Sequence, residues 1–148
     1  MNLEAVEHCL HRAAEQSSVW AVIREATDAT WMIVLADESI VDVEYDAAHA
    51  ELLFRAELGL VNDPFQRSSI NDLILRCHGV IPVPTITLTQ DQRYELLASW
   101  PMDPDAPQPL AVYLDDVASQ VTLWREVVNQ PTATGTSGDA IPELGLFA

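Results

Sequence analysis

The chain has 148 residues, of which 49% are apolar, and this length suits one domain that buries a core of its own. Its 23 acidic residues outnumber 7 basic residues, all of them arginine, so the formal net charge is -16. A field of this sign repels phosphate backbones and anionic membrane surfaces, which argues against nucleic acids and membranes as partners.

The two cysteines, Cys9 and Cys77, lie far apart in the sequence and form no disulfide framework, as is typical of a reducing compartment. The first sixteen residues carry acids and no uninterrupted apolar run, so they do not match the pattern of a signal peptide. No stretch approaches the length and hydropathy of a membrane span. Together these features predict a cytosolic protein.

The N-terminal segment predicts an amphipathic helix. Leu3, Val6 and Leu10 recur at helical spacing over residues 3–16, with acidic and polar residues between them, and Asn2 is a suitable N-cap. Residues 19–26 fit either a continuation of this helix or a strand, and the sequence leaves the choice open.

Three strands are predicted next. Residues 30–37 form a continuous apolar run, which predicts a strand covered on both faces, and residues 39–46 alternate like a half-buried strand. Residues 50–59 have helix-forming side chains, but their period of two favours a strand.

The second half of the chain predicts a short helix, a hairpin and a long helix. The short helix covers residues 69–78 after a cap at Ser68 or Ser69, and Gly79 ends it. A hairpin follows over residues 84–103. Its second strand alternates, but Leu97 stands on the side that should face water. The segment 109–128 predicts a long helix with Trp124 on its inward stripe and proline in its first turn.

The order helix, three strands, helix, two strands, helix predicts an α+β fold, α-β-β-β-α-β-β-α. We expect a two-layer sandwich in which an antiparallel sheet of about five strands packs against three helices. A single domain is expected over residues 1–129. Residues 130–148 are expected to form a tail, flexible in composition, that ends in the apolar stretch IPELGLFA.

The segments TWMIVLAD, SIVDVEYD, ELLFRAELG, SINDLILRCHGV, PTITLTQDQRYELLASWPMD and LAVYLDDVASQVTLWREVV resemble, in this order, the class I type III secretion chaperones, which share the Tir-chaperone fold. The step Trp100-Pro101 at the end of the hairpin and the pair Trp124-Arg125 in the last helix match the pattern of that family. The resemblance covers residues 3–128. The short middle helix and the tail after Gln130 depart from the family pattern.

The resemblance implies a bacterial, cytoplasmic homodimer that serves virulence without catalysis, cofactor or metal. Such a protein holds the N-terminal region of a secreted effector in extended form. The expected effector contacts are Leu3, Val6, Leu10, Leu53, Leu97 and Trp100. The expected dimer contacts are Ile70, Leu73, Ile74, Tyr94 and Leu96.

Two of these assignments have a plainer alternative. Leu97 can be covered by the protein's own helices, and the apolar stripe of the first helix can pack on its own sheet. Trp100, beside Pro101 at a strand end, is predicted as a surface anchor, whereas Trp124 is predicted as core.

Other chemistry is weakly supported. His8, Cys9 and His11, with Cys77-His78, lack the spacing of a zinc site, and the paired acids Asp115-Asp116 and Asp103/Asp105 fit solvated charges. No sequence motif of a nucleophile, a zinc protease or a phosphate loop is present. The alternative function is an acidic inhibitor or immunity protein that blocks a basic toxin or enzyme site. An enzyme with a pocket between sheet and helix is a weaker third reading.

Overall fold

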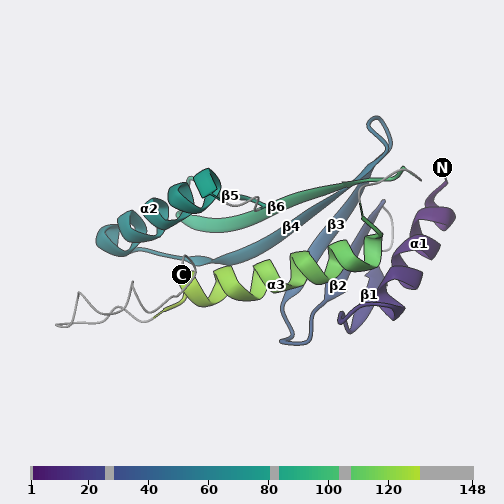
Figure 1. The fold of residues 1–148 in the computed structure, drawn as a ribbon, viewed down its shortest axis with the longest axis horizontal. Coiled ribbons are helices and arrows are strands. Elements are labelled where there is room, and N and C mark those ends of the chain that lie inside the picture. Colours follow the sequence, from purple (N-terminus) through teal and green to yellow (C-terminus); the bar gives the residue numbers. More distant parts are fainter. Residues whose placement is uncertain (1, 26–28, 81–83, 104–107, 131–148) are drawn as a thin grey trace.

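A computed structural model of the chain describes residues 2–25, 29–80, 84–103 and 108–130 (Figure 1). The expected tail therefore lies almost wholly outside the described residues. The fold is α+β, with three helices and one antiparallel sheet. In chain order the elements are α1 (Leu3–Glu15), β1 (Ala21–Arg24), β2 (Thr30–Val34), β3 (Ile40–Asp46), β4 (Glu51–Leu60), α2 (Pro64–Val80), β5 (Thr85–Leu88), β6 (Arg93–Pro101) and α3 (Leu110–Val128).

The sheet has six strands in the order β1-β2-β3-β4-β6-β5, one more than the sequence predicted. The additional strand is β1, from the segment that the sequence left open between helix and strand. It pairs with β2, with Ile23 opposite Met32. Residues 50–59, whose side chains also favour a helix, form the strand β4 as predicted. This strand pairs with β3 on one side and with β6 on the other.

The first helix forms as predicted. The Asn2 side chain accepts a hydrogen bond from the backbone N–H of Ala5 at 2.8 Å, which satisfies one of the free N–H groups at the helix start. Val6, Leu10 and Ala13 lie on the buried side of α1, three and four residues apart.

The second helix is longer than predicted and begins five residues earlier, at Pro64. Proline suits the first turn because its missing N–H would have had no partner within the helix. The side chain of Asp63 accepts a hydrogen bond from the N–H of Phe65 at 3.0 Å and so caps the helix. The expectation of a short middle helix was therefore wrong.

α1 and α3 lie together on one face of the sheet, and α2 lies at the end of β4 and β6 that is far from α1 (Figure 1). On α3, the ring of Tyr113 lies 5.7 Å from that of Phe54 on β4. On α2, Asn71 accepts a hydrogen bond from the hydroxyl of Tyr94 on β6. The apolar stripe of α1 joins the same buried cluster as Trp31 on β2. Trp124 of α3 is fully buried in this cluster, as predicted.

The continuous apolar run of β2 is covered on one face only. Trp31 and Ile33 are buried under the helices, but Met32 and Val34 point to the other face and are only half-buried. The expectation that this strand is covered on both faces was wrong, because no helix of the described chain lies over its second face.

Candidate functional site

The sheet face opposite the helices is open and carries a group of apolar side chains at one end. Paired residues of antiparallel strands share a face, and the registers place Ile23 opposite Met32 and Val34 opposite Ile40. We call Ile23, Met32, Val34 and Ile40 the open-face patch. Ile23 and Ile40 are each 48% exposed, and Met32 and Val34 are half-buried.

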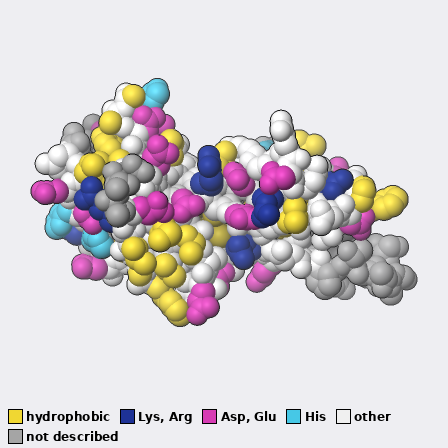
Figure 2. All heavy atoms as spheres, turned by 180° about the vertical axis from the view of Figure 1, so that it is seen from behind, with side chains coloured by type: hydrophobic (Ala, Val, Ile, Leu, Met, Phe, Trp, Pro, Cys, Tyr) yellow, Lys and Arg dark blue, Asp and Glu magenta, His cyan; other side chains and the backbone are white. Residues whose placement is uncertain are grey.

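Figure 2 views the molecule from behind and shows hydrophobic side chains gathered at the end that carries β1 to β3. Acidic and basic side chains dominate the middle of this view. On β3, Asp42 and Glu44 share the open face with Ile40 because they follow it at intervals of two. The patch is therefore bordered by charge on the side that faces the sheet centre.

The patch lies beside an unpaired sheet edge. β1 is the outermost strand on this side, so within the described chain its outer backbone groups have no strand partner. Such an edge is a ready template for another extended chain. An apolar face next to a free edge offers both main-chain hydrogen bonds and side-chain contacts to a bound strand.

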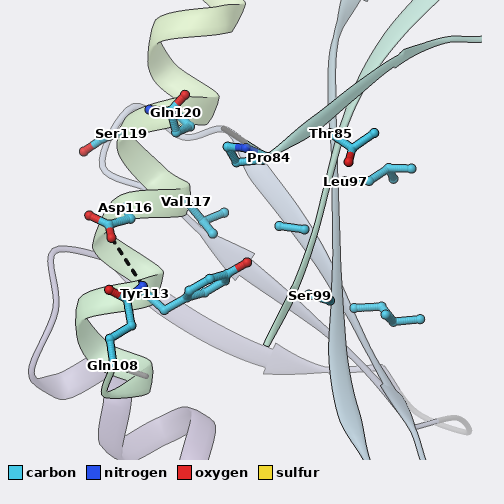
Figure 3. Close-up of a pocket in the computed structure, with 12 residues that line it drawn as sticks. Pro84, Thr85, Leu97, Ser99, Gln108, Tyr113, Asp116, Val117, Ser119 and Gln120 are labelled. Atoms are coloured by element: carbon cyan, nitrogen blue, oxygen red, sulfur yellow. Dashed lines mark hydrogen bonds between the residues drawn. The ribbon is translucent and has the colours of Figure 1, made fainter. Parts of the chain in front are cut away.

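Leu53 and Leu97 form a second apolar area on the open face. They line a hollow of about 280 Å³ over β2, β3, β4 and β6, together with Thr30, Asp42, Glu44 and Arg55. Arg55 lies opposite Leu97 and pairs with Glu95 at 3.7 Å, a contact exposed enough to contribute little stability. Leu97 is half-buried and its side chain points away from α3 (Figure 3), although the residue also borders the cleft between α3 and the strands.

A cleft of about 680 Å³ opens between α3 and the ends of β5 and β6. β5 pairs with β6 only as far as Leu97, so the edge of β6 continues past it at Ser99. The ring of Tyr113 points from α3 toward the strands at this position (Figure 3). Burial raises the pKa of the Tyr113 phenol, although a hydrogen bond with the Ser99 backbone opposes this shift.

The side chains of this cleft do not form a catalytic arrangement. Asp116, which Gln108 contacts at 3.4 Å, is the only charged group among the described lining residues, and they include no histidine or cysteine. A nucleophile with an adjacent base, the usual core of such a site, is therefore not formed by these residues. The cleft therefore does not add support to the hypothesis of an enzyme with a pocket between sheet and helix.

Two of the expected effector contacts are core residues. Val6 and Leu10 are 0% exposed because the stripe of α1 packs on its own sheet, as the plainer alternative held. Leu3 is half-buried against the same cluster. Trp100 is also half-buried against the core, and its indole N–H donates to the carbonyl of Gln108 at 3.2 Å. Of the six expected contacts, Leu53 and Leu97 are the two on the open face.

The expected dimer contacts are also turned inward. The following residues are buried against their own chain, at 0–7% exposure: Ile70, Leu73, Ile74, Tyr94 and Leu96. They therefore offer no surface to a second copy in this structure. The large apolar side chains that α2 does expose are Phe65 and Leu75, which the sequence did not single out. Phe65 and Leu75 lie on another side of α2 than the buried residues, and apolar residues on two sides of one helix were the signal that the sequence offered for this exposed surface.

Sequence reasoning also missed the open-face patch. Met32 and Val34 were assigned to a fully covered strand, and Ile23 lay in the segment left open. The alternation of Ile40 with Asp42 and Glu44 was the available signal, since it puts an apolar residue on an otherwise acidic face.

One group of three metal-ligand side chains is found in the described chain: Asp46, His49 and Glu51, at the β3–β4 turn. His49 Nδ1 lies 2.7 Å from Asp46 Oδ2, and this contact raises the pKa of His49 and lowers that of Asp46. Asp46 also accepts the N–H of Ala48 at 3.1 Å. These contacts account for the group as the side chains of a turn. The residues first considered for a metal, His8, Cys9 and His11, are not part of it.

Comparison with known proteins bears on the fold alone. No protein-family model and no curated protein matches the sequence. None of the helices in the described residues combines the length and the hydropathy that crossing a bilayer requires.

A solved structure, that of the HopA1-SchA chaperone-effector complex, contains a chain with a similar fold. The two chains have a TM-score of 0.60 and 15% sequence identity, and the match covers 82% of this chain and 93% of the other. The chain therefore has the fold of a chain in that chaperone-effector complex, and the resemblance drawn from the sequence is confirmed at the level of the fold.

Proposed function

We propose that this protein is a type III secretion chaperone, which binds the N-terminal region of a cognate secreted effector in extended form. The observation that carries the proposal is the open-face patch, because it places apolar side chains on a helix-free face beside the free edge of β1. The likeness of the fold to a chain of a chaperone-effector complex supports the same class.

An extended segment can add to the β1 edge through main-chain hydrogen bonds while its alternate side chains contact Ile23 and Met32. Ordering an unfolded segment costs about 2–5 kcal/mol, so a chaperone of this kind needs a large apolar contact area. The second apolar area at Leu53 and Leu97 lies across the same face and enlarges that area.

The acidic composition explains how such a surface stays in solution. Asp42 and Glu44 border the open-face patch, and the whole chain carries a formal charge of -16. Two copies that approach through their patches bring like charges together, which opposes self-association. An uncharged or basic segment meets no such repulsion.

The proposal includes a non-catalytic role and a homodimer in the bacterial cytoplasm. The residues expected at the dimer contact on α2 and β6 face inward, so a dimer of the chain in this conformation uses other surface. Light scattering coupled to size exclusion measures the mass of the purified protein directly. A dimer mass is expected, and a monomer at micromolar concentration would contradict this part of the proposal.

Capture experiments test the binding role. The protein is used as bait in an extract of its native host, and the captured polypeptides are mapped by truncation. The Ile40→Asp variant is expected to weaken capture by at least about tenfold, since a charge then stands at the centre of an apolar contact. Val112→Asp is the matched control, because Val112 is 47% exposed but lies on α3. Equal capture by both variants would overturn the role of the patch.

The strong negative charge also favours the alternative, an inhibitor or immunity protein for a basic toxin or enzyme. The two functions differ in their dependence on salt. Binding of a folded basic partner through surface charge weakens steeply as salt rises, whereas an apolar contact does not. A captured partner that is folded, basic and released by moderate salt would favour the alternative.

A further inference from the structure

The outer side of α2 carries two large apolar side chains in water. Phe65 is 85% exposed and Leu75 is 71% exposed, the highest values among the large apolar residues of the described chain. On the inner side of the same helix, Ile70 and Leu73 are buried in the core cluster. Removing exposed apolar surface from water is favourable, so this side of α2 favours an occupant.

The described chain ends next to this helix. The side-chain amide of Gln66 donates to the carbonyls of Val128 at 3.3 Å and Gln130 at 3.0 Å, so the end of α3 is held at the first turn of α2. The chain beyond Gln130 therefore leaves from the first turn of α2, the turn that carries Phe65.

The sequence that follows has two parts. Residues 131–140, PTATGTSGDA, have the composition of a linker, and residues 141–148, IPELGLFA, contain four large apolar residues. A ten-residue linker of this kind spans about 17 Å on average, from about 5–6 Å times the square root of its length. Leu75 lies nine residues after Gln66, or about 14 Å along the helix at 1.5 Å per residue. The reach of the linker thus matches the position of Leu75.

The charges of the tail and of α2 also favour the tail as the occupant of this side of the helix. The tail contains Asp139 and Glu143 and no basic residue. The guanidinium of Arg67 on α2 donates to the carbonyls of Val61 and Asn62, and no described carboxylate lies within ion-pair distance of it. Arg67 therefore gives an acidic segment a favourable position on a molecule that is otherwise strongly negative.

From these observations we propose that residues 141–148 dock on the outer side of α2 of the same chain, where their apolar side chains cover Phe65 and Leu75. A short connection of linker composition gives a millimolar effective concentration, so a weak contact is enough to keep the segment bound. The docked segment shields the two side chains from other copies of the protein.

Amide NMR spectra of the full chain test the proposal. The variant Leu144→Ser/Phe147→Ser is expected to shift amide resonances of residues 64–80 and to leave those of β1 to β3 unchanged. The same two substitutions should shift nothing in α2 when Phe65→Ser and Leu75→Ser are already present. In a Val112→Ser background, the matched control, the shifts should persist.

Two further measurements separate this contact from others. A synthetic peptide of sequence IPELGLFA, added to the Leu144→Ser/Phe147→Ser variant, should restore the α2 resonances only at about millimolar concentration. The differences in α2 amide resonances between the parent protein and the Leu144→Ser/Phe147→Ser variant should be independent of protein concentration. Unchanged α2 resonances in the tail variant would overturn the proposal, and so would shifts that disappear on dilution, which would instead indicate a tail bound to a second copy.

Discussion

The hydroxyl of Tyr94 on β6 donates a hydrogen bond of 2.6 Å to the side-chain oxygen of Asn71 on α2. Tyr94 is 0% exposed, and its hydroxyl also lies 3.3 Å from the carbonyl of Arg67. The sheet and its second helix are thus joined by a polar contact within an apolar layer. A buried polar group that loses its hydrogen-bond partner there lowers the stability of the fold.

Removing the acceptor should destabilise the protein. Asn71→Ala is expected to lower the free energy of unfolding by about 1–2 kcal/mol, because the buried hydroxyl then loses its shorter bond. Urea denaturation followed by circular dichroism measures this. Asn62→Ala, at an exposed position, is the control and should leave the midpoint nearly unchanged. Identical midpoints for the two variants would show that the bond adds nothing to stability.

The same tyrosine predicts a loss of stability in alkali. Burial raises the pKa of the Tyr94 phenol above its ordinary value of 10.0, so the folded state holds this proton more tightly than the unfolded state. The contribution is complete below pH 10.0 and is lost as pH rises through the folded pKa. Urea midpoints measured across this range should fall with pH, and less steeply in Tyr94→Phe. Parallel curves for the two proteins would contradict the prediction.

Two neighbouring residues on opposite faces of β6 give a matched pair. Leu96 is 0% exposed under the helices, and Leu97 faces the open side. Leu96→Asp places an unpaired charge in the core and should prevent stable folding, whereas Leu97→Asp should fold with a midpoint close to that of the parent. Circular dichroism and thermal melting distinguish them. A Leu97→Asp variant that fails to fold would show that Leu97 belongs to the core.

If the proposed function holds, the folded Leu97→Asp variant should also capture less of the effector segment, because Leu97 and Leu53 line the same hollow. The capture assay described for Ile40→Asp measures this directly. Full capture by a folded Leu97→Asp variant would remove this area from the binding surface while leaving the open-face patch in place.

Gly59 occupies a position that no other residue fits. Its φ of 150° accompanies a register shift between Glu57 and Gly59 on β4, and an added Cβ would lie 2.7 Å from Asn129 Oδ1. The side-chain amide of Asn129 donates to the carbonyl of Leu58 at 2.8 Å, so the end of α3 is held against this bulge.

Gly59→Ala is therefore expected to cost about 1–3 kcal/mol in unfolding free energy from backbone strain, with a further cost if Asn129 is displaced. Gly79→Ala is the control, because nothing lies within 4 Å of the added Cβ and alanine is favoured within a helix. Thermal melting of the two variants should show opposite or clearly unequal shifts. Equal shifts would mean that the close approach at Gly59 is relieved without cost.

Local patterns in the sequence predicted most of the elements correctly. The stripe Val6, Leu10 and Ala13 follows the helical period, and the alternation along β3 and β4 follows the period of a strand, since each pattern reflects one buried face. The same patterns did not locate the start of α2 at Pro64 or decide the nature of β1, because a four-residue strand carries too few positions for a period to be read.

The sequence by itself determined the α+β class, the alternating strands with Leu97 on the wrong side of its pattern, and the strong negative charge. Only the tertiary structure decided that α1 and α3 cover the same face, that Val6 and Leu10 are core, and that Met32, Val34 and Ile40 meet beside a free strand edge. The reason is physical: a period reports that a side chain is apolar and on which side of its own element it lies. Whether that side is covered depends on elements far away in the chain.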